Sequence, residues 1–203
     1  MCRVALIDDL EDQYEKYKIR LKKKDIDLIF MDFIQDYAKI VEWLLEQKIE
    51  FVLVDYKLDT KYAFQGSQLM QYINNEIPDL QCVLFTSNTA DDDLVMSKLK
   101  IDKRVFNSRG EEFEDFVNTI KQAVKVFKNR MNASLLEYNK IQEKRNNHGL
   151  SAYELEEMYS IYKRLYSYDL VEYMPKEYFE SNIENKIDNL IKTVEKFIKN
   201  EKW

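Results

Sequence analysis

Short hydrophobic runs alternate with longer segments of helical periodicity along the first 127 residues. The hydrophobic runs, each of which predicts a β-strand, are residues 3–7, 28–31, 51–54, 82–85 and 104–106. The segments in which hydrophobic residues recur every three or four positions, and which predict α-helices, are residues 10–24, 37–48, 67–76, 91–99 and 111–127. Strands that are hydrophobic throughout and alternate with helices are typical of a parallel sheet covered on both faces. The sequence therefore predicts a doubly wound α/β fold with five strands.

The pattern becomes purely helical after the last predicted strand, and its periodicity continues as far as about Arg145. The polar run NNHGLS then predicts a break, after which Ser151 and Glu154 have the spacing of a capping box. Two further helices are expected at residues 152–168 and 176–200. We therefore expect an α/β domain over residues 1–125 and an all-α helical hairpin over residues 126–203.

Charge and hydropathy narrow the classes of function. The net charge is −6, and residues 1–120 carry 16 Lys and Arg against 24 Asp and Glu. Contacts to phosphates need clustered Lys and Arg, so this balance argues against nucleic-acid binding by residues 1–120. Residues 121–203 carry 15 Lys and Arg against 13 Asp and Glu, which leaves nucleic-acid binding there open but unsupported. The first nine residues, MCRVALIDD, contain an apolar run of only four residues, which is too short for a signal peptide or a membrane span. We expect a cytoplasmic protein that does not bind a membrane.

Side chains with oxygen atoms follow three of the predicted strands. Asp8 and Asp9 follow the first strand, Asp55 follows the third, and Thr86 follows the fourth. In an open parallel sheet, reactive groups collect beyond the carboxyl ends of the strands. Three neighbouring carboxylates repel one another, and either a proton or a cation relieves the repulsion. An all-oxygen cluster suits Mg²⁺, and Asp55 is then a candidate nucleophile for phosphorus.

The order of these motifs resembles the receiver domain of two-component response regulators, which have a CheY-like fold. The resemblance covers about residues 1–125. Its elements are the acidic pair Asp8-Asp9, the D-x-x-L pattern DYKL that begins at Asp55, the helix opening GSQL at residues 66–69, and the pair Thr86-Ser87. Each element alone is weak, but the four occur in the family's order and on the strands where the family has them.

The resemblance implies a strand order of 2-1-3-4-5 and a site for phosphorylation. It implies that Asp55 is the phosphoacceptor and that Thr86 is the hydroxyl that follows the phosphoryl group. It also implies a Mg²⁺ ion held by Asp8, Asp9, Asp55 and the backbone carbonyl of Lys57. The phosphoryl group would come from a histidine kinase or a small-molecule phosphodonor, as part of a phosphorelay. Such a protein is not an enzyme beyond its own phosphorylation and dephosphorylation.

One departure from the family pattern lies in the loop after Asp55. Family members usually have a proline after D-x-x-L and a glycine eight residues after the acceptor. Here Asp59 replaces the proline and Gly66 lies eleven residues on, so the loop is about three residues longer. Its aromatic residues Tyr62 and Phe64 reshape access to the site, pack on a partner, or belong to a tolerated surface insertion.

A second departure lies at the fifth predicted strand, where the family has Lys-Pro and this chain reads KRVFNSRG. Spacing from the fourth strand places the lysine position on Ser108. A shift of one residue places it on Arg109, with Phe106 at the position of the family's switch aromatic, and we favour this register. Arg109 is a longer, forked cation and is not equivalent to lysine. Lys103 comes too early on the predicted strand.

Two functions follow from these features. In the first, the chain is a phosphorylation-switched regulator whose C-terminal helices bind a downstream protein partner or a second copy of the chain. In the second, it is a pseudo-receiver adaptor that is never phosphorylated and holds a complex together. The tyrosines of the helix predicted at residues 152–168 either pack within the hairpin or form the partner surface. Mg²⁺-dependent modification of Asp55 separates the two functions.

Overall fold

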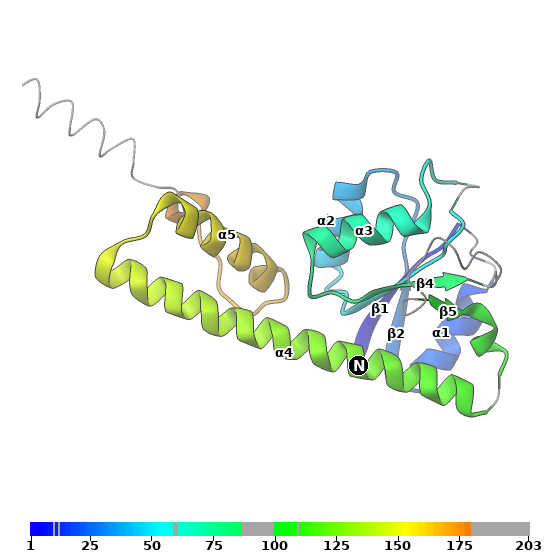
Figure 1. Ribbon diagram of the computed structural model, residues 1–203. Coiled ribbons are helices and arrows are strands. Elements are labelled where there is room, and N and C mark those ends of the chain that lie inside the picture. Colours follow the sequence, from blue (N-terminus) through cyan, green and yellow to red (C-terminus); the bar gives the residue numbers. More distant parts are fainter. Residues whose placement is uncertain (10, 12, 59–60, 87–99, 109, 180–203) are drawn as a thin grey trace, which may run out of the picture. The chain divides into compact units, whose positions relative to one another are not determined.

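The computed structural model describes residues 1–9, 11, 13–58, 61–86, 100–108 and 110–179 (Figure 1). The chain divides into two compact units, Met1–Ala133 and Ser134–Trp203. The expectations for Asp59, Ser87 and Arg109, for the helix at residues 91–99, and for most of the helix at residues 176–200 lie outside the described residues.

The first unit is built on a five-stranded parallel sheet with the order β2-β1-β3-β4-β5. The strands are β1 (Cys2–Ile7), β2 (Ile26–Phe30), β3 (Phe51–Val54), β4 (Cys82–Thr86) and β5 (Lys100–Asp102). The predicted fold class and strand order are confirmed. The last four residues of β1 and all four residues of β3 are buried, which is why their sequences read as uninterrupted hydrophobic runs.

The fifth strand is not where the sequence predicted it. The prediction was Arg104–Phe106, but β5 is Lys100–Asp102, and the 3₁₀ helix η2 (Lys103–Phe106) follows it directly. The Asp102 side chain caps η2 by accepting a hydrogen bond of 2.8 Å from the backbone N–H of Arg104. β5 is short, partly exposed and mostly polar, so it lacks the hydrophobic run on which the prediction depended.

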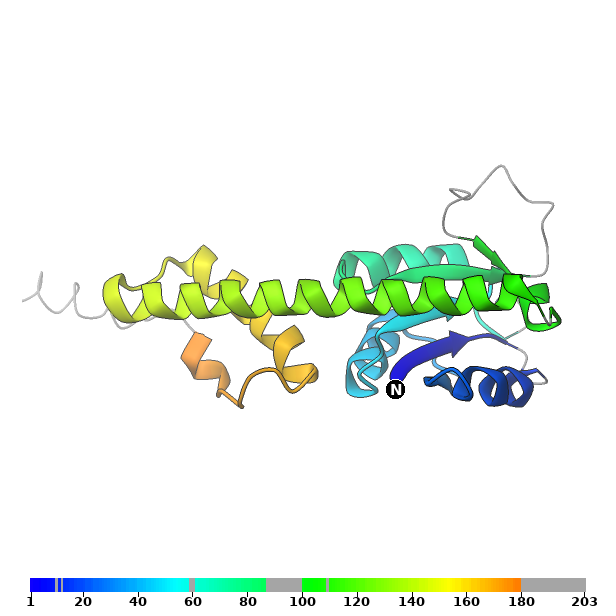
Figure 2. The ribbon, with the colours of Figure 1, turned by 90° about the horizontal axis from the view of Figure 1, so that it is seen from below.

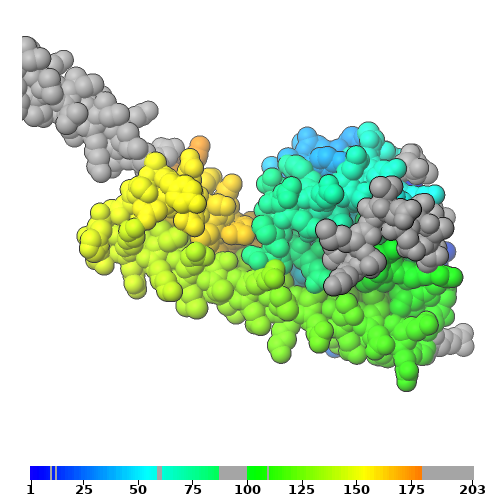
Figure 3. All heavy atoms as spheres, in the orientation of Figure 1, coloured from blue at the N-terminus to red at the C-terminus, as the bar shows by residue number. Residues whose placement is uncertain are grey.

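Helices cover both faces of the sheet (Figure 1). They are α1 (Tyr14–Lys22), α2 (Tyr37–Glu46), α3 (Gly66–Glu76) and α4 (Glu111–His148). α1 and the first part of α4 pack on one face, and α2 and α3 lie on the other, where they form part of the surface seen in Figure 3. Figure 2 shows α4 as a continuous helix, and the division between the two units falls within it. The predicted domain boundary at residues 125 and 126 also falls within α4 and stays a prediction.

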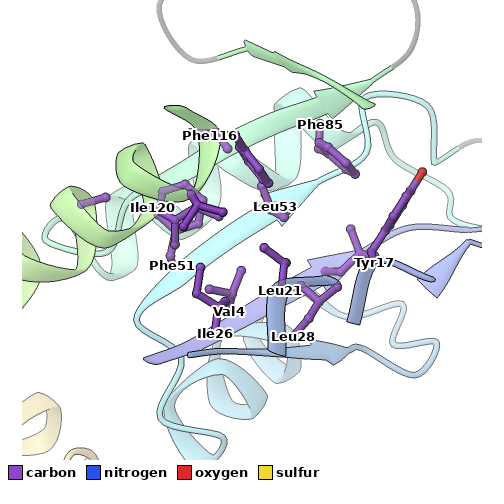
Figure 4. Packing of buried hydrophobic residues seen from close by; sticks show 14 of the residues in the cluster. Val4, Tyr17, Leu21, Ile26, Leu28, Phe51, Leu53, Phe85, Phe116 and Ile120 are labelled. Atoms are coloured by element: carbon purple, nitrogen blue, oxygen red, sulfur yellow. The ribbon is translucent and has the colours of Figure 1, made fainter. Parts of the chain in front are cut away.

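The core between the sheet and the helices α1 and α4 is rich in aromatic side chains (Figure 4). Phe106 of η2 is only 1% exposed. Its ring centroid lies 4.0 Å from that of Tyr17 and 5.3 Å from that of Phe116. The hydrophobic residues of the sequence KRVF therefore anchor a 3₁₀ helix to the core and do not form a strand.

The second unit contains the end of α4, the helix α5 (Ala152–Ser167) and the 3₁₀ helix η3 (Lys176–Phe179). The predicted capping box is present: the Ser151 hydroxyl accepts a hydrogen bond from the backbone N–H of Glu154, whose carboxylate accepts one from the backbone N–H of Ser151. Tyr162 is buried and packs on Phe179 with their ring centroids 4.6 Å apart. Tyr162 is thus an internal residue of this unit, whereas Tyr153 is 74% exposed.

None of the helices in the described part of the chain is both long enough and apolar enough to cross a membrane.

Candidate functional site

Three acidic side chains meet at the carboxyl end of the sheet. Asp8 and Asp9 directly follow β1, and Asp55 directly follows β3, the strand beside it. The backbone N–H of Asp55 donates a 2.8 Å hydrogen bond to the carbonyl of Ile7, which extends the pairing of these strands to the acids. All three side chains are buried, and one carboxylate oxygen from each lies within 4.8 Å of the others. The sheet thus brings together the acids that the sequence predicted to be neighbours.

The cation of this site is Lys103, the first residue of η2. Its ammonium nitrogen lies 2.6 Å from Oδ2 of Asp8 and 3.1 Å from Oδ1 of Asp55. The interpretation that Lys103 comes too early was wrong because it placed the fifth strand four residues too late. β5 lies two strand positions from β3, about 10 Å away, so only a long side chain from its end reaches Asp55.

Asp55 and Lys103 both have shifted pKa values in this cluster. Burial raises the pKa of Asp55 to about 6, the charge of Lys103 opposes this shift, and the charges of Asp8 and Asp9 add to it. Burial alone would lower the pKa of Lys103, but its hydrogen bond to Asp8 and the charges of Asp8 and Asp55 outweigh burial and raise it. Lys103 is therefore charged at neutral pH.

The donor set of the acidic cluster fits a hard divalent cation. Three buried carboxylates offer only oxygen ligands, and a single ammonium leaves a net charge of −2 when all three are ionised. Mg²⁺ prefers oxygen ligands and is held in proteins by a few carboxylates and water. Lys57 lies two residues beyond Asp55 with its side chain exposed, and the role of its carbonyl stays a prediction.

Thr86 is the last residue of β4, the strand between β3 and β5. It is 4% exposed and pairs in register with Asp102, the residue before Lys103. The strand order therefore places Thr86 at the same edge as Asp55 and Lys103. Its role as a switch hydroxyl stays a prediction.

Comparison with known proteins found similar solved structures only. No family model and no curated protein matches the sequence. Among solved structures, the response regulator StyR matches with a TM-score of 0.50 and 13% identity over 96% of this chain and 98% of StyR. The signal receiver domain of an HD domain-containing protein from Pseudomonas fluorescens matches with a TM-score of 0.48 and 16% identity over 64% of this chain and 92% of its own. A response regulator receiver domain protein from Clostridium thermocellum matches with a TM-score of 0.46 and 15% identity, over 62% and 95%.

The first unit has the fold of a response regulator receiver domain. At identities this low the likeness shows the fold alone, and it confirms the resemblance that the motifs predicted. We call residues 1–133 the receiver unit.

Gly66, the first residue of α3, lies against the backbone of Asp55 in the receiver unit. A Cβ atom at position 66 would lie 1.9 Å from the carbonyl oxygen of Asp55, closer than any packing allows. The backbone N–H of Gly66 donates a 3.1 Å hydrogen bond to the carbonyl of Tyr56, which closes the loop between them. The loop therefore returns to Asp55 through a glycine, and any larger residue there would displace the backbone of Asp55 or of the loop.

The loop after Asp55 buries the aromatic side chain of Tyr62. Tyr62 is 5% exposed, and its ring centroid lies 5.0 Å from that of Phe33 and 5.2 Å from that of Phe64. Burial raises the pKa of Tyr62 to about 12, and the charges of Asp9 and Asp8 contribute to the shift. Of the alternatives that the sequence left open, a mere surface insertion is therefore wrong for Tyr62, and the loop forms part of the surroundings of the site.

Sequence reasoning missed two residues of α1 that lie close to Lys103 or its segment. Tyr17 lies in the helix predicted at residues 10–24, and its ring centroid lies 5.8 Å from that of Phe85 (Figure 4). Burial raises the pKa of Tyr17, against the charge of Lys103. Arg20 binds the backbone of the turn after η2, and no sequence pattern indicated this contact.

Proposed function

We propose that this chain is a response regulator whose receiver unit accepts a phosphoryl group on Asp55 in the presence of Mg²⁺. The observation that carries the proposal is the position of the Lys103 ammonium between Asp8 and Asp55, beside a third buried acid, Asp9. These residues supply a nucleophile, ligands for a cation, and a charge that pairs with the incoming phosphate. Lys103 thus takes the role for which the sequence had suggested Arg109.

The proposed reaction is a phosphoryl transfer. An oxygen of the ionised Asp55 carboxylate attacks phosphorus, and the bond from phosphorus to the histidine nitrogen or acyl oxygen of the donor breaks. The leaving group keeps the electron pair, and Asp55 becomes an acyl phosphate. The Lys103 ammonium pairs with a phosphoryl oxygen, and the Thr86 hydroxyl donates a hydrogen bond to another. Asp8, Asp9 and Asp55 would hold Mg²⁺, which would supply positive charge to neutralise the transferring oxygens.

The modification is reversible in this scheme. Attack of water on the same phosphorus breaks its bond to Asp55 and releases inorganic phosphate with the free carboxylate. The chemical activity of the chain is then limited to its own phosphorylation and dephosphorylation. A histidine kinase or a small-molecule phosphodonor is the proposed donor, and the cytoplasm is the proposed location.

The proposed output is a change in what the C-terminal helices bind. In the second unit Tyr153, Leu170 and Tyr173 are partly or largely exposed, as expected of a surface that binds a downstream protein or a second copy of the chain. Residues 121–203 carry 15 Lys and Arg against 13 Asp and Glu, and this nearly neutral balance does not favour nucleic acid as the partner.

One observation favours the alternative function, an adaptor that is never phosphorylated. The Lys103 ammonium already pairs with Asp8 and Asp55, so part of the acidic charge is neutralised without a metal ion. An acidic cluster whose charge is partly neutralised by a lysine can persist as a structural feature of a pseudo-receiver.

Measurement of the intact protein mass after incubation with acetyl phosphate and Mg²⁺ tests the proposal. The proposal expects one phosphoryl adduct on the wild type and none on Asp55→Asn or in the presence of EDTA. An absent adduct, together with absent Mg²⁺ binding by titration calorimetry, would favour the adaptor.

A further inference from the structure

Arg20 of α1 binds the turn that follows η2. One terminal nitrogen of its guanidinium group donates to the backbone carbonyl of Phe106, and the other donates to the carbonyl of Ser108 over 2.8 Å. These carbonyls are two residues apart, and a planar guanidinium group presents its donors in a fork that can bind both at once. A lysine ammonium has no such fork.

The guanidinium group of Arg20 also contacts the aromatic ring of Phe113. Its central carbon lies 3.8 Å from the ring centroid of Phe113, near the start of α4. The Arg20 side chain is half-buried in this position, so its bonds are less exposed to competing water than those of a surface arginine. Arg20 therefore connects three parts of the receiver unit: α1, the turn after η2, and α4.

The segment that carries Lys103 has little regular structure of its own. β5 has three residues and lies at the edge of the sheet, and η2 has four residues. Helices of the 3₁₀ type this short have poor hydrogen-bond geometry. α1 attaches this segment to the rest of the unit, because Tyr17 packs on Phe106 and the Lys16 ammonium lies 2.7 Å from Oδ1 of Asn107. Arg20 is the member of this group that binds the backbone itself.

We propose that Arg20 is a positioning residue for Lys103: by holding the carbonyls of Phe106 and Ser108 it keeps the Lys103 ammonium between Asp8 and Asp55. Arg20 acts through the backbone of residues 103–108 and has no part in the chemistry at Asp55. The consequence for phosphoryl transfer rests on the proposed function, whereas the position of the ammonium does not. The two are therefore tested separately.

The first test observes the ammonium of Lys103 directly in the unphosphorylated full-length chain. Proton–nitrogen NMR spectra of ¹⁵N-labelled lysine side chains show ammonium groups whose proton exchange is slowed by ion pairing, and Lys103→Gln identifies the signal of Lys103. The variants are Arg20→Lys, which keeps the charge but not the fork, and Arg20→Gln. Arg130 of α4 pairs with Asp79 over 3.6 Å with its side chain 55% exposed, so Arg130→Lys and Arg130→Gln are matched controls.

We expect the slowed Lys103 signal in the wild type and in both Arg130 variants, and its loss in both Arg20 variants while circular dichroism shows them folded. An unchanged Lys103 signal in Arg20→Lys and Arg20→Gln would overturn the proposal. The absence of a slowed signal in the wild type would overturn it as well, because the ammonium would then not be held.

The second test separates positioning from general stability. With acetyl phosphate as donor, Arg20→Gln should lower the phosphorylation rate roughly tenfold in the wild-type background. In the Lys103→Gln background the same change should have almost no effect, because Arg20 acts only through Lys103. Equal losses in both backgrounds would assign Arg20 a merely structural role. If the wild type is not phosphorylated but the NMR result is as expected, the proposed function fails and the positioning role stands.

Discussion

The ammonium nitrogen of Lys103 lies 3.1 Å from a carboxylate oxygen of Asp55, although β4 separates the strands that carry them. This contact joins the group that we expect to be phosphorylated to the one positive charge that the described residues bring to it. It also determines the first prediction.

Replacement of Lys103 by glutamine should slow phosphorylation of Asp55 by acetyl phosphate by roughly 100-fold, the usual cost of removing one group that stabilises charge in a transition state. Lys103→Arg should recover part of the rate, because it restores the charge with a different shape. Lys100→Gln, at the start of β5, is the matched control and should keep the wild-type rate. A rate for Lys103→Gln equal to that of the control would contradict the assignment of Lys103. The measurement is the initial rate of adduct formation by intact mass.

Asp9 should contribute to Mg²⁺ binding independently of the Lys103 ion pairs, which involve Asp8 and Asp55. Asp9→Asn removes one of three clustered carboxylates, so we expect the dissociation constant for Mg²⁺ to rise by at least roughly tenfold. The exposed Asp115→Asn on α4 serves as the control and should bind Mg²⁺ as the wild type does. Titration calorimetry measures both, and equal affinities in the two variants would remove Asp9 from the proposed ligands.

Gly66 and Gly110 provide a matched pair of substitutions. A Cβ at Gly66 would lie 1.9 Å from the Asp55 carbonyl oxygen, whereas a Cβ at Gly110 would meet nothing within 4 Å. Gly66→Ala must displace the loop or Asp55, so we expect a loss of about 1–3 kcal/mol in the free energy of unfolding. The phosphorylation rate should fall as well, because the nucleophile moves. Gly110→Ala should change neither the free energy of unfolding nor the phosphorylation rate. Denaturant unfolding measures the first quantity and the initial rate of adduct formation measures the second. Equal losses in Gly66→Ala and Gly110→Ala would contradict the prediction.

Much of the receiver fold could be predicted because the buried strands β1, β3 and β4 are continuous hydrophobic runs. The acids were found for a related reason: each interrupts hydrophobicity at the point where a strand ends. β5 could not be found in this way, because Lys100, Ile101 and Asp102 are all partly exposed at the edge of the sheet.

The error in β5 carried over to the site. Val105 and Phe106 formed the expected strand, so the lysine position was sought after them, at Ser108 or Arg109. In the structure these hydrophobic residues belong to η2, and the cation precedes them. The contacts of Arg20 could not be predicted from the sequence either, because they join residues 86 and 88 positions apart in the chain. No local periodicity encodes such a pair.

The start of α5 should respond to acid, because two partners hold the charged form of Glu154. The ammonium of Lys144, followed by the backbone N–H and the hydroxyl of Ser151, lowers the pKa of Glu154 to about 2. For a carboxyl group whose pKa is lower in the folded state, the stabilisation is complete above its ordinary value of 4.5 and is lost as the pH falls toward 2.

We therefore expect the backbone amides at the start of α5 to lose hydrogen-exchange protection as the pH falls from 4.5 to about 2, after correction for the intrinsic exchange rate. Glu154→Gln should have weaker protection at pH 6 and little further change over that interval. Glu157→Gln, an exposed position on the same helix, should titrate as the wild type does. If Glu154→Gln and Glu157→Gln behave alike, the capping box and its ion pair do not stabilise this helix in solution, and the approach of Lys144 to Glu154 has no energetic consequence.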